Sequence, residues 1–202
     1  MGEHPTWQQL IDQNPGHSSW YVERFRVMAA SGDDLAGEAR FVDAVAPRAA
    51  RILDAGCGPG RVGGALHALG HEVVGVDLDP ELIQAAEADW PGPRWLVGDL
   101  AALDLPARGV LGGFDVVVCA GNVMTFIDPA DRVAVLGRLA AHLGGDGRIA
   151  VGFGAGRGYG FDSFRADVDT AGLAIDLELG GWDVRPFTSA SDWMTALLRH
   201  PT

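Results

Sequence analysis

The chain has 202 residues, of which 48% are hydrophobic and 21% charged, a composition typical of a soluble globular protein. Its formal net charge is −12 and its 15 basic residues are all arginines, which argues against a nucleic-acid partner and excludes chemistry at a lysine amine. Two cysteines are too few for a disulfide framework, and the polar N-terminal segment lacks the pattern of a secretory signal. We expect a cytoplasmic protein without a membrane span, as a monomer or homodimer.

The predicted elements begin with two helices, near residues 20–30 and 33–45, the second ended by Pro47. Residues 1–46 are interpreted as an N-terminal helical cap and 47–202 as the core of one domain, 1–202. Strands and helices then alternate, and Asp79 and Pro80 give one helix a strong start as its cap and first residue. The predicted strands are 51–56, 72–77, 94–99, 114–121 and 147–154, and the helices between them are 61–69, 80–90 and 128–143.

The C-terminal part breaks this alternation. A glycine-rich stretch, 152–160, and a helix over 162–171 precede two strands, 173–187 and 193–199, which are joined by a short polar turn. Two strands joined without a helix between them form an antiparallel hairpin. The sequence therefore predicts an α/β fold, with a parallel sheet flanked by helices and completed by a hairpin.

The stretch RILDAGCGPGRVGGAL, residues 51–66, indicates a ligand site. Its alternating glycines allow a tight turn and let a ligand lie against bare backbone. Asp54, Asp77, Asp99 and Gly121 all lie at predicted strand ends, and parallel sheets bind ligands beyond the carboxyl ends of their strands.

A dinucleotide site also fits a glycine turn that is followed by an acid such as Asp77. That fingerprint needs its third glycine three residues after the second, where this chain has Arg61. Asp54 adds negative charge where a pyrophosphate would be disfavoured, yet it suits a cationic ligand. The sequence thus favours a ligand that carries adenosine and positive charge.

LDAGCGPGRVG resembles the first motif of the class I S-adenosylmethionine (SAM)-dependent methyltransferases. GVDLDP, VGDLAALDL and FDVVVCAGNVM resemble the later motifs of this family in order and at ordinary spacing. The resemblance covers roughly 51–154. It implies a Rossmann-like fold, with a mostly parallel seven-stranded sheet, an antiparallel last strand and helices on both faces.

The resemblance also implies roles for residues of the first two strand ends. Gly56, Cys57 and Gly58 would lie along the methionine part of SAM, in a turn that Gly60 completes. Asp54 would lie near the ammonium group, directly or through water.

Beyond the turn, Asp77 would accept hydrogen bonds from the ribose hydroxyls, and Leu78 would pack on adenine. Carboxylates are suitable acceptors for hydroxyl and amino donors. The other residues assigned to the cofactor are Asp99 at the adenine amino group, Leu100 on the other side of the ring, and Cys119, Ala120 and Gly121 at the amino-acid end.

The acceptor side is less determined by the sequence. In the family an N-terminal helix often closes over the cofactor, so Tyr21 and Arg26 are expected to reach it, although the helix's aromatics could equally be core and its arginines solvated. Asn122 is a plausible acceptor-site residue, and the absence of two prolines and an aromatic after it disfavours nucleobase or glutamine methylation. His17 is the candidate base. The 152–160 stretch fits a lid or a surface connector equally well.

The predicted function is transfer of the sulfonium methyl of SAM to an unidentified small molecule by in-line displacement, with S-adenosylhomocysteine as the second product. A SAM-binding sensor or assembly module without transferase activity is the alternative, and a nicotinamide-dependent oxidoreductase is a third reading. No cluster of metal ligands is visible in the sequence, so no metal is expected.

Overall fold

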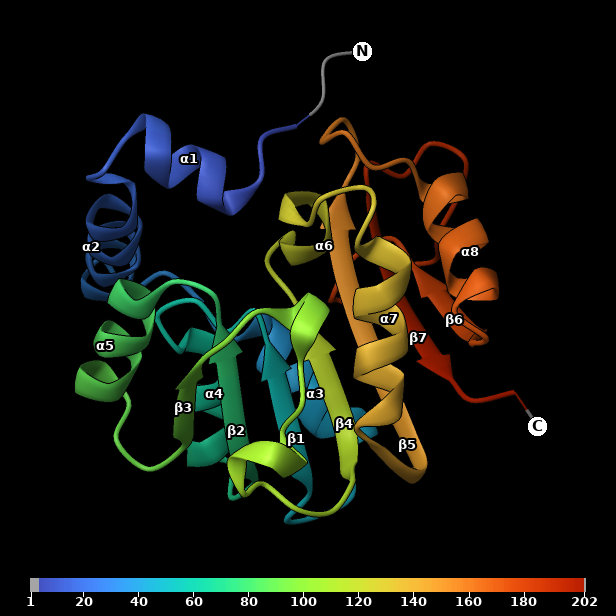
Figure 1. The fold of residues 1–202 in the computed structure, drawn as a ribbon, viewed down its shortest axis with the longest axis horizontal. Coiled ribbons are helices and arrows are strands. Elements are labelled where there is room, and N and C mark those ends of the chain that lie inside the picture. The colour runs from blue at the N-terminus through green and yellow to red at the C-terminus, as the bar shows by residue number, and fades with distance from the viewer. Residues whose placement is uncertain (1–3, 202) are drawn as a thin grey trace.

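A twisted seven-stranded sheet forms the centre of the computed structural model, which describes residues 4–201 (Figure 1). The strands are β1 (Arg51–Ala55), β2 (Glu72–Asp77), β3 (Arg94–Val97), β4 (Phe114–Cys119), β5 (Leu143–Gly154), β6 (Ala174–Leu179) and β7 (Trp193–Arg199). Their order is β3-β2-β1-β4-β5-β7-β6, and β7 alone runs antiparallel to the other six strands. The predicted fold class, mostly parallel with a reversed last strand, is confirmed.

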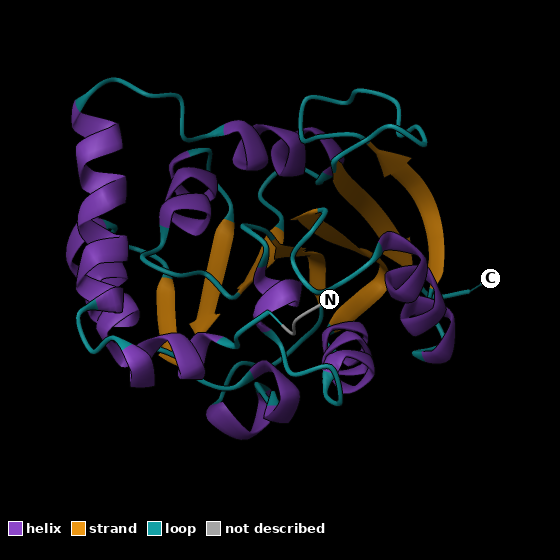
Figure 2. Ribbon diagram, turned by 90° about the horizontal axis from the view of Figure 1, so that it is seen from above, coloured by secondary structure: helices purple, strands orange, loops and turns teal. Residues whose placement is uncertain are grey.

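Helices cover both faces of this sheet (Figure 2). They are α1 (Trp7–Gln13), α2 (His17–Ala30), α3 (Gly37–Val45), α4 (Arg61–Ala68), α5 (Pro80–Asp89), α6 (Val123–Phe126), α7 (Arg132–Ala141) and α8 (Phe161–Thr170). Two 3-10 turns, Leu100–Ala102 and Pro106–Arg108, follow β3.

Neighbouring residues of each central strand point to opposite faces, as a strand requires. In β1, Leu53 belongs to the core cluster that includes side chains of α7 and α8, whereas Ile52 belongs to the cluster that includes side chains of α3 and α4. Both residues are fully buried. Burial on both faces explains the continuous apolar runs in the sequence.

The N-terminal segment differs from its prediction in two ways. A first helix, α1, was not predicted, and α2 begins at His17 rather than near Trp20. Helix α3 packs on the sheet through Phe41 and Val42, so it belongs to the core layer. Helices α1 and α2, and the short α6 that follows β4, lie above the carboxyl edge of β1, β2 and β4 (Figure 1).

The C-terminal hairpin has a longer connection than predicted. β6 ends at Leu179, and 180–192 form a loop instead of the second half of a strand and a short turn. Gly180 is bonded within this loop to the carbonyl of Arg185. Trp182 of this loop packs over Gly152, where a Cβ atom would lie 2.4 Å from the indole.

Candidate active site

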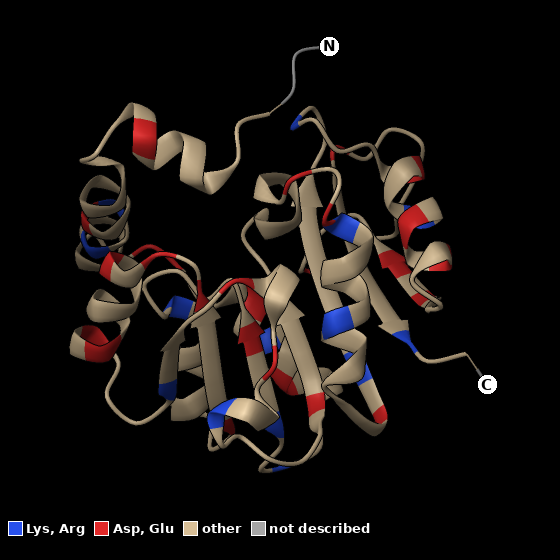
Figure 3. Ribbon diagram, viewed as in Figure 1, with Lys and Arg blue, Asp and Glu red and all other residues tan. Residues whose placement is uncertain are grey.

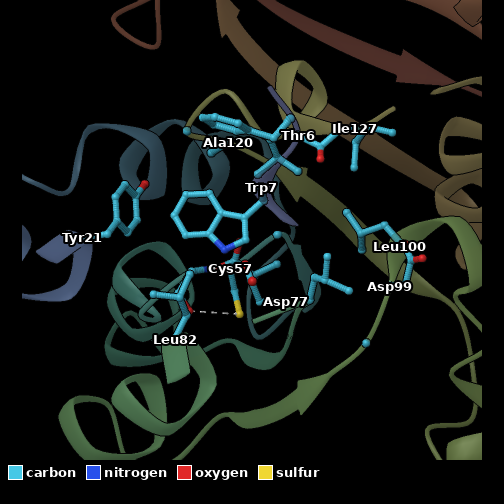
Figure 4. A pocket seen from close by; sticks show the side chains of 18 of the residues that line it. Thr6, Trp7, Tyr21, Cys57, Asp77, Leu82, Asp99, Leu100, Ala120 and Ile127 are labelled. Carbon is cyan, nitrogen blue, oxygen red and sulfur yellow. Dashed lines mark hydrogen bonds between the residues drawn. The ribbon is translucent and has the colours of Figure 1, made fainter. Parts of the chain in front are cut away.

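A cavity of about 300 Å³ lies at the carboxyl edge of β1, β2, β3 and β4, beside α1 and α2 (Figure 4). Eleven of the predicted site residues line it: Tyr21, Asp54, Gly56, Cys57, Gly58, Asp77, Leu78, Asp99, Leu100, Ala120 and Gly121. The strand ends that the sequence analysis singled out therefore do meet at one place.

The glycine turn after β1 forms the floor of this cavity. The N–H groups of Gly56 and Cys57 both donate to the carbonyl of Val76, at 2.8 and 3.0 Å, which ties the turn to β2. Gly56 has a φ of +77°, and a Cβ atom there would lie 2.4 Å from the Val123 side chain. Only glycine satisfies both the backbone conformation and this close approach.

Three residues assigned to the cofactor lie outside the cavity lining: Gly60, Cys119 and Arg26. A Cβ atom on Gly60 would lie 2.9 Å from Ala86 and 3.1 Å from Trp90 and Trp95, so this glycine allows close packing between α4 and α5. Cys119 is fully buried in the core, and the chain reaches the cavity only at the next residues, Ala120 and Gly121.

Asp54 is the most deeply buried acid of the site, with 2% of its surface exposed. Its Oδ2 accepts a hydrogen bond from the N–H of Gly63 at 2.8 Å. Burial raises the pKa of this carboxyl to about 7, and the hydrogen bond and the charge of Arg61 only partly oppose that rise. Asp54 is therefore costly to ionise until a cation lies beside it.

Asp77 is held in a fixed orientation at the end of β2. One carboxylate oxygen accepts from the N–H of Gly58 at 2.8 Å, and the other accepts from the N–H of Asp79 at 3.0 Å. Burial raises its pKa to about 6, against the lowering effect of these bonds. Its position beside the glycine turn matches the place expected from the sequence.

Asp99 and two apolar residues lie at the other side of the cavity (Figure 4). Asp99 is exposed and accepts from the N–H of Ala101 at 2.9 Å, which caps the 3-10 turn that follows. Leu100 is buried, whereas Leu78 is 43% exposed. Leu78 and Leu100 provide apolar surface beside the carboxylates of Asp77 and Asp99, which is compatible with the adenine site expected from the sequence.

Tyr21 and Arg26, the two residues of α2 that were predicted to contact the cofactor, have different positions. Tyr21 lines the cavity, and burial raises the pKa of its phenol. Arg26 forms a bidentate ion pair with Asp89 of α5, at 2.9 and 3.0 Å, away from the cavity. A different arginine, Arg61, lines the cavity instead.

Neither predicted acceptor-side residue lines the cavity. The side-chain oxygen of Asn122 accepts from the N–H of Gly154 at 2.8 Å, so the amide joins the ends of β4 and β5. His17 packs its ring against Trp7 and Trp20, with centroid distances of 5.0 and 5.4 Å. Both positions are explained by packing and backbone bonding.

The glycine-rich stretch behaves as a connector anchored in the core. Tyr159 is buried, stacks on Phe153 at 5.3 Å and donates to Asp167 at 2.6 Å. The guanidinium of Arg132 lies 4.0 Å from the Tyr159 ring. No residue of 152–160 lines the cavity among the residues that the structure describes.

Sequence reasoning missed the residues that α1 contributes, above all Trp7. The indole projects into the middle of the cavity, between Tyr21 on one side and Leu100 and Ile127 on the other (Figure 4). A signal for the helix was present: Thr6 and Gln9 form a capping box, in which each side chain accepts from the other's backbone N–H.

Carboxylates dominate the charge of the cavity, and acidic segments gather at this edge of the sheet (Figure 3). The acids in the lining are Asp54, Asp77, Asp99, Asp128 and Asp131. Arg61 is the one basic residue lining the cavity within 4–201, and its guanidinium is already bound to Glu38, at 2.6 and 2.8 Å, and to the carbonyl of Leu35. Within the same range no group of three or more His, Cys, Asp or Glu residues is arranged to hold a metal ion.

Known proteins resemble this chain in sequence and in fold. Residues 52–147 match a family model described as a methyltransferase domain. The crystal structure of a TehB-like SAM-dependent methyltransferase from Corynebacterium glutamicum is 45% identical, over 93% of this chain and 100% of that chain, with a TM-score of 0.88.

Two further proteins show weaker similarity. Ubiquinone biosynthesis O-methyltransferase of Thiobacillus denitrificans is 33% identical over 102 residues, which are 50% of this chain and 44% of that protein. This chain therefore spans less than half the length of that relative. A SAM-dependent methyltransferase from Clostridium acetobutylicum is 14% identical over 91% of this chain and 99% of that chain, and its TM-score of 0.76 supports the fold alone.

Proposed function

This chain belongs to the class I SAM-dependent methyltransferases, and from that premise we propose that its cavity holds SAM and presents the methyl group to a small-molecule acceptor. The family membership makes it a transferase with SAM as the methyl donor. The observation that carries the assignment of the site is the meeting of four separate strand ends at one cavity whose charged lining is mainly acidic.

The positions of the lining residues support a definite orientation of the cofactor. Asp77 would accept from the ribose, since its carboxylate is fixed by two backbone donors beside the glycine turn. Leu78, Asp99 and Leu100 would hold the adenine. Asp54 would pair with the ammonium group, because a buried carboxyl gains most from a cation at close range.

We further propose that the acceptor is uncharged or cationic. The part of the cavity away from these residues is lined by Trp7, Phe126 and Ile127, with Asp128 and Asp131 at its rim. Arg61 already has Glu38 as its partner, so an anionic acceptor would face several carboxylates without a free cation in the described lining. Burial of an unpaired charge beside like charges is strongly unfavourable.

The chain's contribution to catalysis is positional. SAM supplies an activated sulfonium methyl when bound, and the protein needs to bring an acceptor into line with it. Effective-molarity arguments give such positioning up to about 7–11 kcal/mol of barrier lowering. Tyr21 and Trp7 line the cavity and limit the space in it. We assign no base role to His17, which packs outside the lining.

Release of S-adenosylhomocysteine from SAM, measured across a panel of small amines, phenols and carboxylic acids, tests this function. We expect turnover with a neutral or amine acceptor and none with the matched carboxylates. Asp77→Ala should abolish most turnover at low SAM concentration, whereas Asp104→Asn should not. Asp104 is exposed, accepts from the N–H of Ala107 at 3.1 Å and lies outside the cavity lining. Equal loss in both variants would contradict the proposed site.

The cytoplasmic location and the oligomeric state remain predictions. Cys57 and Cys119 are free and buried, which is compatible with the reducing cytoplasm expected from the sequence. Within 4–201 no helix is long and apolar enough to cross a membrane. Analytical ultracentrifugation would decide between the monomer and the homodimer.

A further inference from the structure

Asp79 connects three helices at the edge of the cavity. It is 3% exposed, and one of its oxygens caps α5 by accepting from the N–H of Glu81 at 2.9 Å. Its other oxygen accepts from the indole Nε1 of Trp7 in α1 at 3.0 Å and from the hydroxyl of Ser18 in α2. A carboxylate accepts hydrogen bonds without donating any, so it can serve all three donors at once.

The same residue also contacts the wall of the cavity. Its backbone N–H donates to Asp77 at 3.0 Å, which is one of the two bonds that orient that carboxylate. Asp77 faces the cavity from below, and Trp7 lines it from the opposite side. Asp79 lies two residues after Asp77 in the chain. Its backbone N–H contacts the end of β2, and its side chain contacts α1 and α2.

Helix α1 has few other attachments. None of its residues is fully buried, and its side-chain hydrogen bond and its ring contacts with other elements within 4–201 all come from Trp7. The indole meets Tyr21 and Phe126 edge to face, with centroid distances of 5.2 and 5.7 Å, and donates to Asp79. Hydrogen bonds to a charged acceptor are about twice as strong as neutral ones, so the bond to Asp79 is a principal anchor of the helix.

We propose that Asp79 is a positioning residue for methyl transfer: its carboxylate holds α1 and α2 closed over the cavity while its N–H keeps Asp77 oriented. This inference rests on the proposed function of the cavity. It assigns to the second acid of the GVDLDP stretch a role in the cover as well as the helix cap that the sequence predicts. Trp7 then encloses bound SAM only while this carboxylate is present.

Asp79→Asn removes the bond that holds α1 while it keeps the cap of α5. Asparagine is as good a cap as aspartate and leaves the backbone N–H in place, so α5 and Asp77 are preserved. With its side-chain oxygen on the N–H of Glu81, its amide nitrogen faces the Trp7 indole, and this nitrogen donates and cannot accept from the indole. We expect the Kd for SAM, measured by calorimetry, to rise about tenfold. Backbone amides of α1 should exchange hydrogen faster by a similar factor, even without SAM.

Asp89→Asn is the matched control. It makes the same chemical change on the same helix and breaks the Arg26 pair, which also joins α2 to α5 but lies away from the cavity. We expect wild-type SAM affinity and wild-type exchange of α1 in this variant. Equal effects of Asp79→Asn and Asp89→Asn would overturn the proposal, because they would show a general loosening of α2 on α5.

Trp7→Phe keeps the test decisive if Asp79→Asn does not fold. It removes the indole donor and leaves the cap intact, so it should reproduce both the weaker SAM binding and the faster exchange of α1. In the double variant the combined effect should be smaller than the sum of the two single effects, because both changes remove the bond between Trp7 and Asp79. Wild-type affinity and exchange in Trp7→Phe would overturn the proposal. Failure of the wild-type protein to bind SAM would refute the proposed function instead. The role of Asp79 in holding α1 would still be tested, because hydrogen exchange of α1 is measured without cofactor.

Discussion

The cavity has two walls that are built differently. The sheet wall consists of strand ends whose backbone is fixed by the ladder, and its acids, Asp54 and Asp77, are oriented by backbone donors. The cover consists of α1 and α2, and its anchor, Trp7, bonds to a residue 72 positions away along the chain. Because the backbone of the sheet wall is fixed, the cofactor site on that side is preformed. The cover is held by a few side-chain contacts, so it can open at a small cost in free energy.

The glycine turn offers the largest effect on the sheet wall. Gly56→Ala should lower the free energy of unfolding by about 2–4 kcal/mol, since it combines left-handed strain of about 1–2 kcal/mol with overpacking against Val123. Gly121→Ala is the control: its φ is +70°, but a Cβ atom there meets nothing within 4 Å, so only the strain should appear. Urea unfolding measures both, and equal losses would show that the close approach is unimportant.

Loss of one wall acid should weaken cofactor binding without unfolding the protein. Asp77→Ala should reduce SAM affinity by about 1.5–3 kcal/mol, the scale for removing hydrogen bonds to a charged group. Calorimetry on a variant with wild-type circular dichroism provides the measurement. An unchanged Kd would remove Asp77 from the cofactor site and leave the cover as the main source of affinity.

The buried acids also predict how pH acts on the sheet wall. Their folded pKa values, about 7 for Asp54 and about 6 for Asp77, lie above the unfolded reference near 4. The folded state therefore favours their protonated forms, and their contribution to stability is fully present below about pH 4 and is lost as pH rises to about 7. SAM affinity should change in the opposite direction, because the ammonium group favours ionised Asp54 and the donor hydroxyls of the ribose favour ionised Asp77.

Asp54→Asn tests these opposite effects of pH on stability and on SAM affinity. The variant keeps an acceptor for the Gly63 N–H but has no titrating group, so both its melting temperature and its SAM affinity should vary less between about pH 5.5 and pH 8 than in the wild type. Thermal unfolding and calorimetry at the two pH values give the comparison. An identical pH response in both proteins would exclude Asp54 as the titrating group.

The smallest effect is expected at the outer surface of the cover. Arg26→Ala should leave the Kd for SAM within about twofold, because the ion pair with Asp89 is exposed and lies outside the cavity lining. The same calorimetric titration measures it. A tenfold or greater loss would mean that Arg26 leaves Asp89 and reaches the cofactor, as the sequence analysis had expected.

The difference between the two walls also explains what the sequence could predict. Asp54, Gly56 and Asp77 lie in short motifs at strand ends, and one sheet edge brings them together whatever the rest of the chain does. The position of Trp7 depends on packing against α5 and α6, which no local pattern encodes. The 180–192 loop was misjudged for a similar reason, since its Trp182 packs on Gly152, which is distant in the sequence.

Calorimetric titration of the wild-type chain with SAM, S-adenosylhomocysteine and NAD tests the central claim most directly. We predict that SAM and S-adenosylhomocysteine each bind one site per chain and that NAD gives no binding heat. Binding of NAD, together with the absence of heat from SAM and its product, would contradict the assignment of the cavity.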